Sequence, residues 1–332
     1  MLTCLAAWLR TGGVAASVVG NSPLFDAAFE ALQTDELFDE AVSIICDLIH
    51  ETLEIEDNIE VIQKIVPRLI GLKPLILAAT DDIERIRGFT KILAEAGEWY
   101  IPLMLQHQST FFPIVEQLAQ CARCEELDIV QITFSFWYKL SKGLQKAPDN
   151  PANQPFIDIY TTLVDIIFGH LKYPEDLASL TAQERDDFRE FRHNIGDTLK
   201  DCCAVLGVNA CLKRAYDAMV REIQLGHSAK WQAVEAPLFA MRSMGAKVDP
   251  SDNEILPEIM NTLPRLPPHP KIRYAAILVI SRYTEWTEQH PEHVPFQLDY
   301  ISAGFGDADN EVWLASASAL KYLCQDCRRV SS

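Results

Sequence analysis

Residues 38–53 read FDEAVSIICDLIHETL, and this stretch decides the fold class. Its large apolar residues recur at spacings of four, three, four and four: Phe38, Val42, Ile45, Ile49 and Leu53. Residues three and four apart share one face of an α-helix, whereas a strand would alternate at a spacing of two. The stretch therefore predicts one amphipathic helix with a single buried stripe.

Outward from this helix, apolar helical segments follow one another in both directions. Ser22 precedes Pro23 in the pattern of an N-cap followed by proline at the first helical position. No alternating Val/Ile/Thr run and no Asn-Gly or Asp-Gly turn indicates a strand or hairpin. We expect helices at these ranges: 24–32, 35–53, 58–79 with a kink at Pro67, 83–96, 112–121, 130–144, 156–171, 183–206, 210–224, 231–246, 255–263, 272–289, 294–303 and 311–327.

The helices come in pairs, and a period of about 40 residues built from two helices is typical of HEAT repeats. We expect an all-α HEAT-repeat α-solenoid, a superhelical array of antiparallel helix pairs. Residues 1–332 would form one continuous array of about seven pairs. Since Leu2, Leu5, Ala6, Trp8 and Leu9 begin as half of a repeat, we also expect the central segment of a longer array. Such a fold offers an extended surface, so a binding protein is the first expectation.

The formal net charge of −18 restricts the partners. Nucleic-acid binding needs a basic surface, so we expect no direct nucleic-acid contact. A basic partner would fit the charge, and so would simple solubility of an acidic helical protein. No window of about 18 residues is free of charged and polar breaks, so we expect no transmembrane helix and no membrane partner.

The sequence contains no strong catalytic or metal-binding motif. The sequence lacks phosphate-binding glycine loops, H-E-x-x-H and G-x-S-x-G, so we expect no enzyme and no cofactor. His290 and His293 lie in an inter-helix turn without a third ligand, and the C-x-x-C pairs Cys121/Cys124 and Cys324/Cys327 lie within expected helices rather than on zinc-ribbon turns. The other cysteines are typical of buried thiols in a reducing compartment.

Two acidic regions are the candidate binding sites. One runs from Asp26 to Glu60 without a single Lys or Arg, and the other covers residues 175–190. Concentrated like charges are tolerated on a solvated face or where a basic partner binds, and both explanations stay open. The candidate docking residues for a basic partner are Glu36, Asp39, Glu40, Asp47, Glu51, Asp176, Glu184, Asp186 and Asp187. Arg185 and Arg189 beside the last two also indicate ion pairs on one helix face.

Residues 134–138, FSFWY, form a dense aromatic block. At helical spacing Phe134, Trp137 and Tyr138 share a face, and we expect them to fill the core between repeats. A peptide-binding hot spot is the alternative.

These strings are also where the chain resembles a known family. FSFWYKL at 134–140 and ERDDFREFR at 184–192, with CLAAWLR at 4–10 and SPLFDAAFEAL at 22–32, resemble the central repeats of importin-β-type nuclear transport receptors (karyopherins) of the transportin-3 branch. The resemblance covers the whole chain in order, and the combination of strings is more specific than any one of them.

The resemblance implies a HEAT-repeat receptor that shuttles between nucleus and cytoplasm. Its expected partners are basic or serine/arginine-rich and RNA-binding cargo proteins, FG-repeat nucleoporins, and Ran-GTP, which releases the cargo. In that family the main Ran-binding repeats and the arginine-rich cargo helix lie outside the region resembled here. The alternative function is a HEAT-repeat scaffold subunit of a cytoplasmic complex, which would not bind FG repeats.

Overall fold

The computed structural model describes residues 4, 8–9, 13–79 and 81–328, and these form helices and turns without strands. Leu2, Leu5 and Ala6, on which the expected half-repeat rests, lie outside the described residues. The chain divides into two compact units, Met1–Ile159 and Tyr160–Ser332, and each is described by itself. The all-α prediction is confirmed by the helices of both units.

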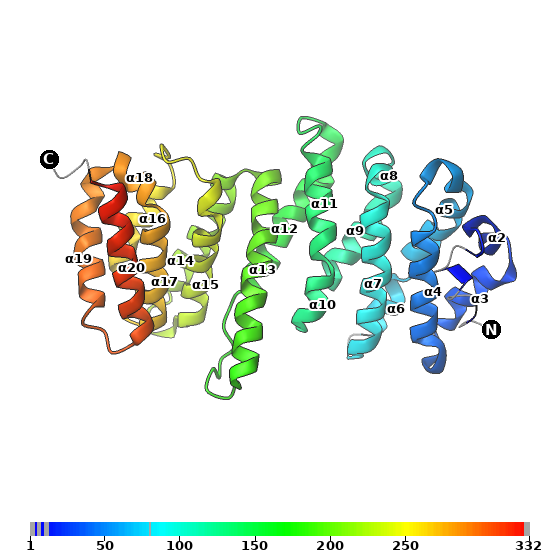
Figure 1. Cartoon of the computed structure of the whole chain (residues 1–332), viewed down its shortest axis with the longest axis horizontal. Helices are drawn as coiled ribbons and strands as arrows, with labels where there is room; N and C mark the ends of the chain where they lie inside the picture. Colours follow the sequence, from blue (N-terminus) through cyan, green and yellow to red (C-terminus); the bar gives the residue numbers. More distant parts are fainter. Residues whose placement is uncertain (1–3, 5–7, 10–12, 80, 329–332) are drawn as a thin grey trace. The chain divides into compact units, whose positions relative to one another are not determined.

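Unit 1 consists of short and medium helices joined by tight turns (Figure 1). In chain order they are α2 (Ala16–Gly20), α3 (Pro23–Ala31), η1 (Asp35–Leu37), α4 (Phe38–His50), α5 (Ile55–Ile70), α6 (Lys73–Ala78), α7 (Ile83–Trp99), α8 (Ile101–Gln106), α9 (Gln108–Cys121), α10 (Leu127–Ile132), α11 (Phe134–Leu144) and η2 (Pro151–Asn153). α12 (Gln154–His170) follows and crosses the division between the units.

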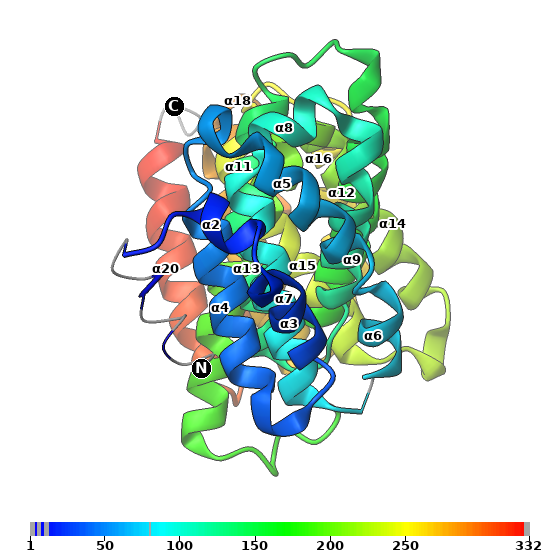
Figure 2. The ribbon, with the colours of Figure 1, turned by 90° about the vertical axis from the view of Figure 1, so that its right-hand side faces the viewer.

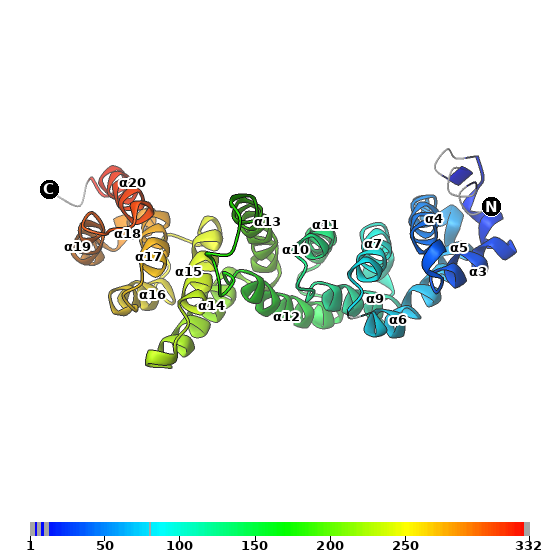
Figure 3. The same ribbon diagram turned by 90° about the horizontal axis from the view of Figure 1, so that it is seen from below.

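The helices of unit 1 form two layers. α4, α7 and the pair α10–α11 lie side by side in one layer, and α5, α6 and α9 lie in the other (Figure 3). α2 packs on α3 and α5, while α3 packs on α4 (Figure 2). The chain thus passes back and forth between the two layers, with α5–α6 and α10–α11 each forming one passage, as the expected HEAT pairs require.

Unit 2 repeats this arrangement with α13 (Ala182–Leu206) as its longest helix. The remaining elements are α14 (Val208–Ile223), η3 (Gly226–Ser228), α15 (Trp231–Met244), η4 (Gly245–Lys247), α16 (Leu256–Thr262), η5 (Leu263–Arg265), α17 (Pro270–Arg282), α18 (Thr284–Gln289), η6 (Pro291–His293), α19 (Val294–Gly304) and α20 (Asn310–Asp326). α13, α15, α17 and α20 pack in sequence as one layer, and α14, α16 and α19 belong to the other (Figure 3).

Local sequence signals account for several helix starts. The Ser22 hydroxyl accepts a hydrogen bond from the Leu24 amide at 3.2 Å, with Pro23 at the first helical position, as expected. At α13, Thr181 and Glu184 form a reciprocal capping box. The stripe on α4 is buried at its first four positions, and only Leu53, beyond the helix end, is 39% exposed.

Three expected helices are interrupted, and two of the breaks have a local cause. Helix α5 continues past Pro67, where a kink is predicted, and ends at Ile70 with Gly71 as its C-cap. Pro74, at the start of α6, lacks the N–H that would extend α5. At Thr133 the hydroxyl bonds the Val130 carbonyl at 2.8 Å and separates α10 from α11. The expected helix 272–289 is likewise split at Tyr283.

The aromatic block also differs from the prediction. Phe136 and Trp137 are fully buried, whereas the Tyr138 side chain is 52% exposed. The buried face of α11 therefore contains Phe136 and Trp137, whose ring centroids lie 4.8 Å apart. The assignment of Tyr138 to the core was therefore wrong, while that of Trp137 is confirmed.

Polar contacts between neighbouring repeats join residues one repeat apart in sequence. The separations run from 41 to 50 residues in these pairs: Thr52–Tyr100, Arg85–Asp35, Arg87–Asp128, Lys139–Glu98, Arg192–Glu235, Arg214–Asp165, Tyr283–Met241 and Thr284–Asp326. This spacing matches the repeat length inferred from the sequence.

Candidate interaction surfaces

The first acidic set surrounds α4 in unit 1. Glu36 lies in η1 and Asp39 in the first turn of α4, and both are exposed. Glu40, Asp47 and Glu51 are half-buried along the same helix and its end. Asp39 and Glu40 also stabilise α4 by opposing the partial positive charge of its N-terminus.

Most of these carboxylates are not neutralised within the described chain. Glu36, Asp39, Glu40 and Glu51 form no hydrogen bond or ion pair with another described residue. Their neighbours differ: Asp26 pairs with Arg68, and Asp35 pairs with Arg85 at 2.5 Å. The structure thus brings the members of this set together around one helix and leaves four of them available to a cation.

The second acidic set, in unit 2, is engaged locally. Asp176 accepts hydrogen bonds from the amides of Ala178 and Ser179, and Glu184 belongs to the capping box. Asp186 pairs with Arg189 at 3.0 Å, and Asp187 accepts from Gln183 at 2.7 Å. These carboxylates order the start of α13 and the loop before it, and are already partly compensated.

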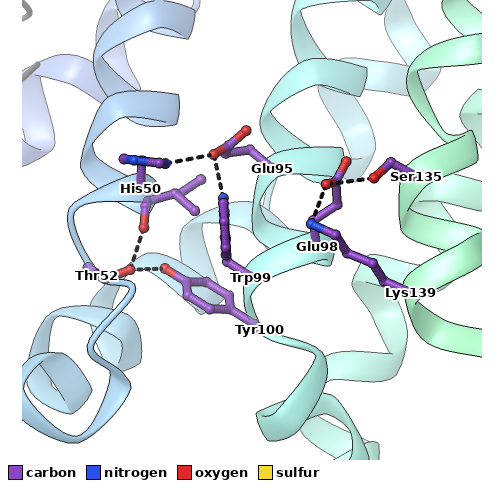
Figure 4. Close-up of polar contacts among 9 residues, drawn as sticks. His50, Thr52, Glu95, Glu98, Trp99, Tyr100, Ser135 and Lys139 are labelled. Carbon is purple, nitrogen blue, oxygen red and sulfur yellow. Dashed lines mark hydrogen bonds and ion pairs between the residues drawn. The ribbon is translucent and has the colours of Figure 1, made fainter. Parts of the chain in front are cut away.

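A polar and aromatic strip across α4 and α7 was missed by the sequence reasoning (Figure 4). Trp99 donates its indole N–H to Glu95 Oε1 at 2.6 Å, and His50 Nδ1 lies 3.6 Å from the same oxygen. The His50 ring meets Trp99 edge to face at 5.5 Å. Deeper in, the hydroxyls of Tyr100 and Thr52 are hydrogen-bonded at 2.8 Å, and burial raises the pKa of Tyr100.

The strip continues from α7 onto α11. Glu98 Oε2 accepts from Ser135 Oγ at 2.8 Å and from Lys139 Nζ at 2.7 Å (Figure 4). The same ammonium lies 4.6 Å from the Trp99 ring centroid. Trp99 is thus fixed from both sides and half-exposed, an arrangement frequent at protein interfaces. The only signal in the sequence was the spacing of Glu95, Glu98 and Trp99 along one helix. It could not reveal their partners His50, Ser135 and Lys139, which come from other repeats.

Unit 2 holds a buried ion pair that sequence reasoning also missed. Arg192 Nη2 lies 2.7 Å from Glu235 Oε2, with both side chains under 5% exposed. The guanidinium is centred 4.4 Å from the Tyr173 ring and 4.0 Å from the Phe239 ring. Burial raises the pKa of Glu235, against the lowering effect of Arg192. Arg192 and Glu235 come from α13 and α15, so only the fold brings them together.

The weak metal candidates are occupied by protein contacts. His290 is buried and stacked on Trp286, with Nδ1 2.8 Å from the Trp286 carbonyl oxygen and Nε2 3.0 Å from Asn253 Oδ1. His293 is buried beside it, and the thiols of Cys121, Cys124, Cys324 and Cys327 are free. Within the described ranges no three His, Cys, Asp or Glu side chains group as metal ligands, and every described helix is too short or too polar to span a bilayer.

Comparison with known proteins identifies relatives along the whole chain. Models of the transportin-3/importin-13 family match in two places: its second TPR domain at residues 81–170 and its third TPR domain at residues 253–331. An uncharacterized protein of Schizosaccharomyces pombe is 41% identical over 99% of this chain and 36% of its own length. The mRNA transport regulator MTR10 of Saccharomyces cerevisiae is 33% identical, again over 99% and 36%.

The structural comparison supports the same fold. Importin-13 in its cytosolic state superposes with a TM-score of 0.79 at 16% identity, over 91% of this chain and 39% of that chain. Importin-13 of Gallus gallus is 25% identical over 99% of this chain and 35% of its own length. The chain therefore spans about a third of the length of the curated relatives that it matches.

Proposed function

Because the chain belongs to the transportin-3/importin-13 branch of the importin-β family of nuclear transport receptors, we propose that it is the central HEAT-repeat part of a nuclear import receptor. Its cargo would be serine/arginine-rich or other RNA-binding proteins with basic segments. The mechanism is non-covalent: cargo binds by surface contacts, FG-repeat nucleoporins carry the receptor between cytoplasm and nucleus, and Ran-GTP, bound mainly outside this chain, releases the cargo.

The observation that supports basic cargo is the uncompensated acidic set around α4. Glu36, Asp39, Glu40 and Glu51 have no cationic partner among the described residues. In a chain with a formal net charge of −18, they add to a potential that attracts arginine-rich segments. The second set, of Asp176, Glu184, Asp186 and Asp187, is a weaker proposal because its carboxylates already serve local contacts.

A binding titration tests this proposal. A dye-labelled peptide of alternating arginine and serine is titrated with the chain, and fluorescence anisotropy is followed at several salt concentrations. We expect affinity to fall as salt rises, because exposed charges are screened over about 8–10 Å near physiological ionic strength. At each salt concentration, the double variant Glu36→Gln/Asp39→Asn should bind the peptide more weakly than the unchanged chain.

The matched control removes two other exposed charges from unit 1. Glu125→Gln/Glu126→Gln removes the same amount of negative charge, and these two carboxylates also lack a described partner. Equal weakening in both double variants would mean that overall charge attracts the peptide without a site at α4. Salt-independent binding would instead assign the contact to apolar or aromatic residues.

FG-repeat peptides separate transport from the scaffold alternative. A transport receptor should bind them, whereas a cytoplasmic scaffold should not. A pull-down with Ran-GTP is a further check, because tight retention by this chain alone would contradict a main Ran site outside it.

We also propose that residues 1–332 form a single continuous array. The division between the units falls inside α12, an uninterrupted helix from Gln154 to His170. Limited proteolysis should therefore leave this helix intact, and early cleavage within it would argue for two separate domains.

A further inference from the structure

A hollow in unit 2 runs across α13, α15 and α17. It encloses about 670 Å³, with the loop before α13 forming one wall through Tyr173, Leu177 and Leu180. A second hollow of about 400 Å³ shares three lining residues with the first: His193, Phe239 and Arg242. Because of this shared lining, the two form one groove, which we name the α13–α17 groove.

The lining is basic although the chain is acidic. The larger hollow is lined by five Arg and Lys side chains but only two carboxylates, Glu235 and Glu311. The chain as a whole carries 47 acidic residues against 29 basic ones. The lining of the larger hollow is therefore opposite in sign to the net charge of the chain.

Some of these cations are neutralised within the protein. Arg192 pairs with Glu235, Lys271 with Glu311, and Arg189 with Asp186. These pairs stabilise the groove, and the cations within them are not available to a ligand. They account for three of the five cations of the larger hollow.

Lys200 of the smaller hollow is also neutralised, by Asp197 at 2.7 Å, and three other cations of the groove form no ion pair with a described carboxylate. Arg185 donates only to the carbonyl oxygen of Leu180, at 2.8 and 3.1 Å, so no carboxylate balances its charge. Arg242, shared by both hollows, and Arg282, in the smaller one, form no ion pair with a described residue. A Cβ at Gly245 would lie 2.4 Å from Arg282 Cγ, so this glycine allows the arginine stem to cross η4.

The interior of the groove combines a buried cation with aromatic walls. The Arg192 side chain is 3% exposed, yet its Nε has no hydrogen-bond partner among the described residues. A buried donor without a partner is costly, which makes such a site favourable for a ligand acceptor. Around it, Phe188, Phe239 and Tyr274, with Leu278, offer apolar contact area.

We propose that the α13–α17 groove binds an acidic segment of a partner protein, with carboxylates at Arg185, Arg242 and Arg282 and an apolar side chain inside the larger hollow. The uncompensated guanidinium groups supply the charge complementarity, because arginine matches carboxylates with two parallel N–H donors. The apolar wall favours a peptide over a free anion. This inference is independent of basic-cargo binding at α4, since it concerns the opposite charge and other helices.

The probe is a dye-labelled synthetic peptide of alternating glutamate and leucine with a central phenylalanine. Its binding to the full chain is measured by fluorescence anisotropy, beside three matched peptides. In these, glutamine replaces glutamate, phosphoserine replaces glutamate, or alanine replaces the phenylalanine and leucines. We expect saturable, salt-sensitive binding of the glutamate peptide, and little binding of the glutamine and alanine peptides.

The variants Arg185→Gln and Arg242→Gln locate the site. Each removes one uncompensated charge at a position outside the core, and thermal melts verify that the fold is kept. Losing one charge-assisted hydrogen bond should weaken binding about tenfold. Arg221→Gln is the matched control, because Arg221 is exposed on α14 and forms no ion pair with a described residue.

Four results would overturn the proposal. Equal affinities in the groove variants and in Arg221→Gln would place the peptide elsewhere, and absence of saturable binding would leave the groove without this ligand. Saturation by the phosphoserine peptide alone would contradict carboxylate recognition. Displacement of the bound peptide by a single-stranded oligonucleotide at equal concentration would contradict a protein partner.

Discussion

Replacement of Phe136 by alanine tests the packing of unit 1 most directly. Phe136 on α11 is fully buried, and a Cβ at Gly97 of α7 would lie 2.7 Å from its Cδ2. Its ring therefore fills the contact between α7 and α11. Tyr138, two residues along, is 52% exposed, so its replacement is the natural comparison.

The expected cost follows from the area removed. A buried aromatic side chain covers roughly 150–250 Å², which at about 25 cal/mol/Å² corresponds to about 4–6 kcal/mol. Phenylalanine lies at the lower end, and a compact unfolded state reduces the value by roughly 10–40%. The lost area alone then gives about 2–3.5 kcal/mol, and the cavity left behind adds to it, so we expect Phe136→Ala to lower the free energy of unfolding by about 3–4 kcal/mol, within the range measured for buried phenylalanines. Tyr138→Ala should cost about 1 kcal/mol.

Urea unfolding followed by far-UV circular dichroism measures both variants. If the slope of the unfolding free energy against urea concentration is unchanged, unfolding exposes the same surface in both variants, and their midpoints can be compared directly. Equal costs, or a larger cost for Tyr138→Ala, would refute the orientation of α11 and restore the surface suggested by the periodicity of the sequence alone.

Further predictions concern a carboxyl group, a close helix contact and the thiols. Because burial raises the pKa of Glu235 above its ordinary 4.5, the folded protein binds this proton more tightly than the unfolded one. The free energy of unfolding, measured relative to that of the Glu235→Gln variant, should therefore increase as the pH falls from above the raised pKa towards 4.5. Urea midpoints plotted against pH test this, and they would show the opposite slope if folding lowered the pKa of Glu235. Gly88→Ala places a Cβ 2.5 Å from the Phe38 ring and should cost about 1–3 kcal/mol, whereas Gly169→Ala, with no atom within 4 Å, should stabilise by up to about 1 kcal/mol; thermal melts that shift the same way would contradict this contrast. Exposed Cys4 and Cys324 should react first with a thiol reagent, and buried Cys121, with a pKa raised to about 11 by burial, should react only on unfolding, which timed mass spectrometry would establish or disprove.

The helices could be predicted because their signals are local. Ser22 and Pro23 mark a helix start within two residues, and the stripe from Phe38 to Ile49 identifies a buried face from spacing alone. The interruption at Thr133 was missed because a threonine hydroxyl bonding back to a carbonyl is compatible with a continuing helix as well as a broken one.

The candidate surfaces were harder to predict because they join repeats. The acidic set around α4 was visible as a run of charge in one segment. Arg192 and Glu235 are 43 residues apart, and nothing in either segment alone indicates the other. Pairing within one helix could be predicted, as Arg189 beside Asp186 shows, but pairing between repeats, such as Asp26 with Arg68 and Asp35 with Arg85, could not.

The contacts between residues 41 to 50 apart also determine how each unit would respond to force. Each such contact joins one repeat only to the next, so no single bond holds distant repeats together. If a unit were pulled from its ends, its repeats would detach one interface at a time, and the peak force would be set by the weakest interface rather than by the number of repeats. Strengthening one interface, for example through Arg87 and Asp128, would change where extension begins and leave the remaining repeats as compliant as before.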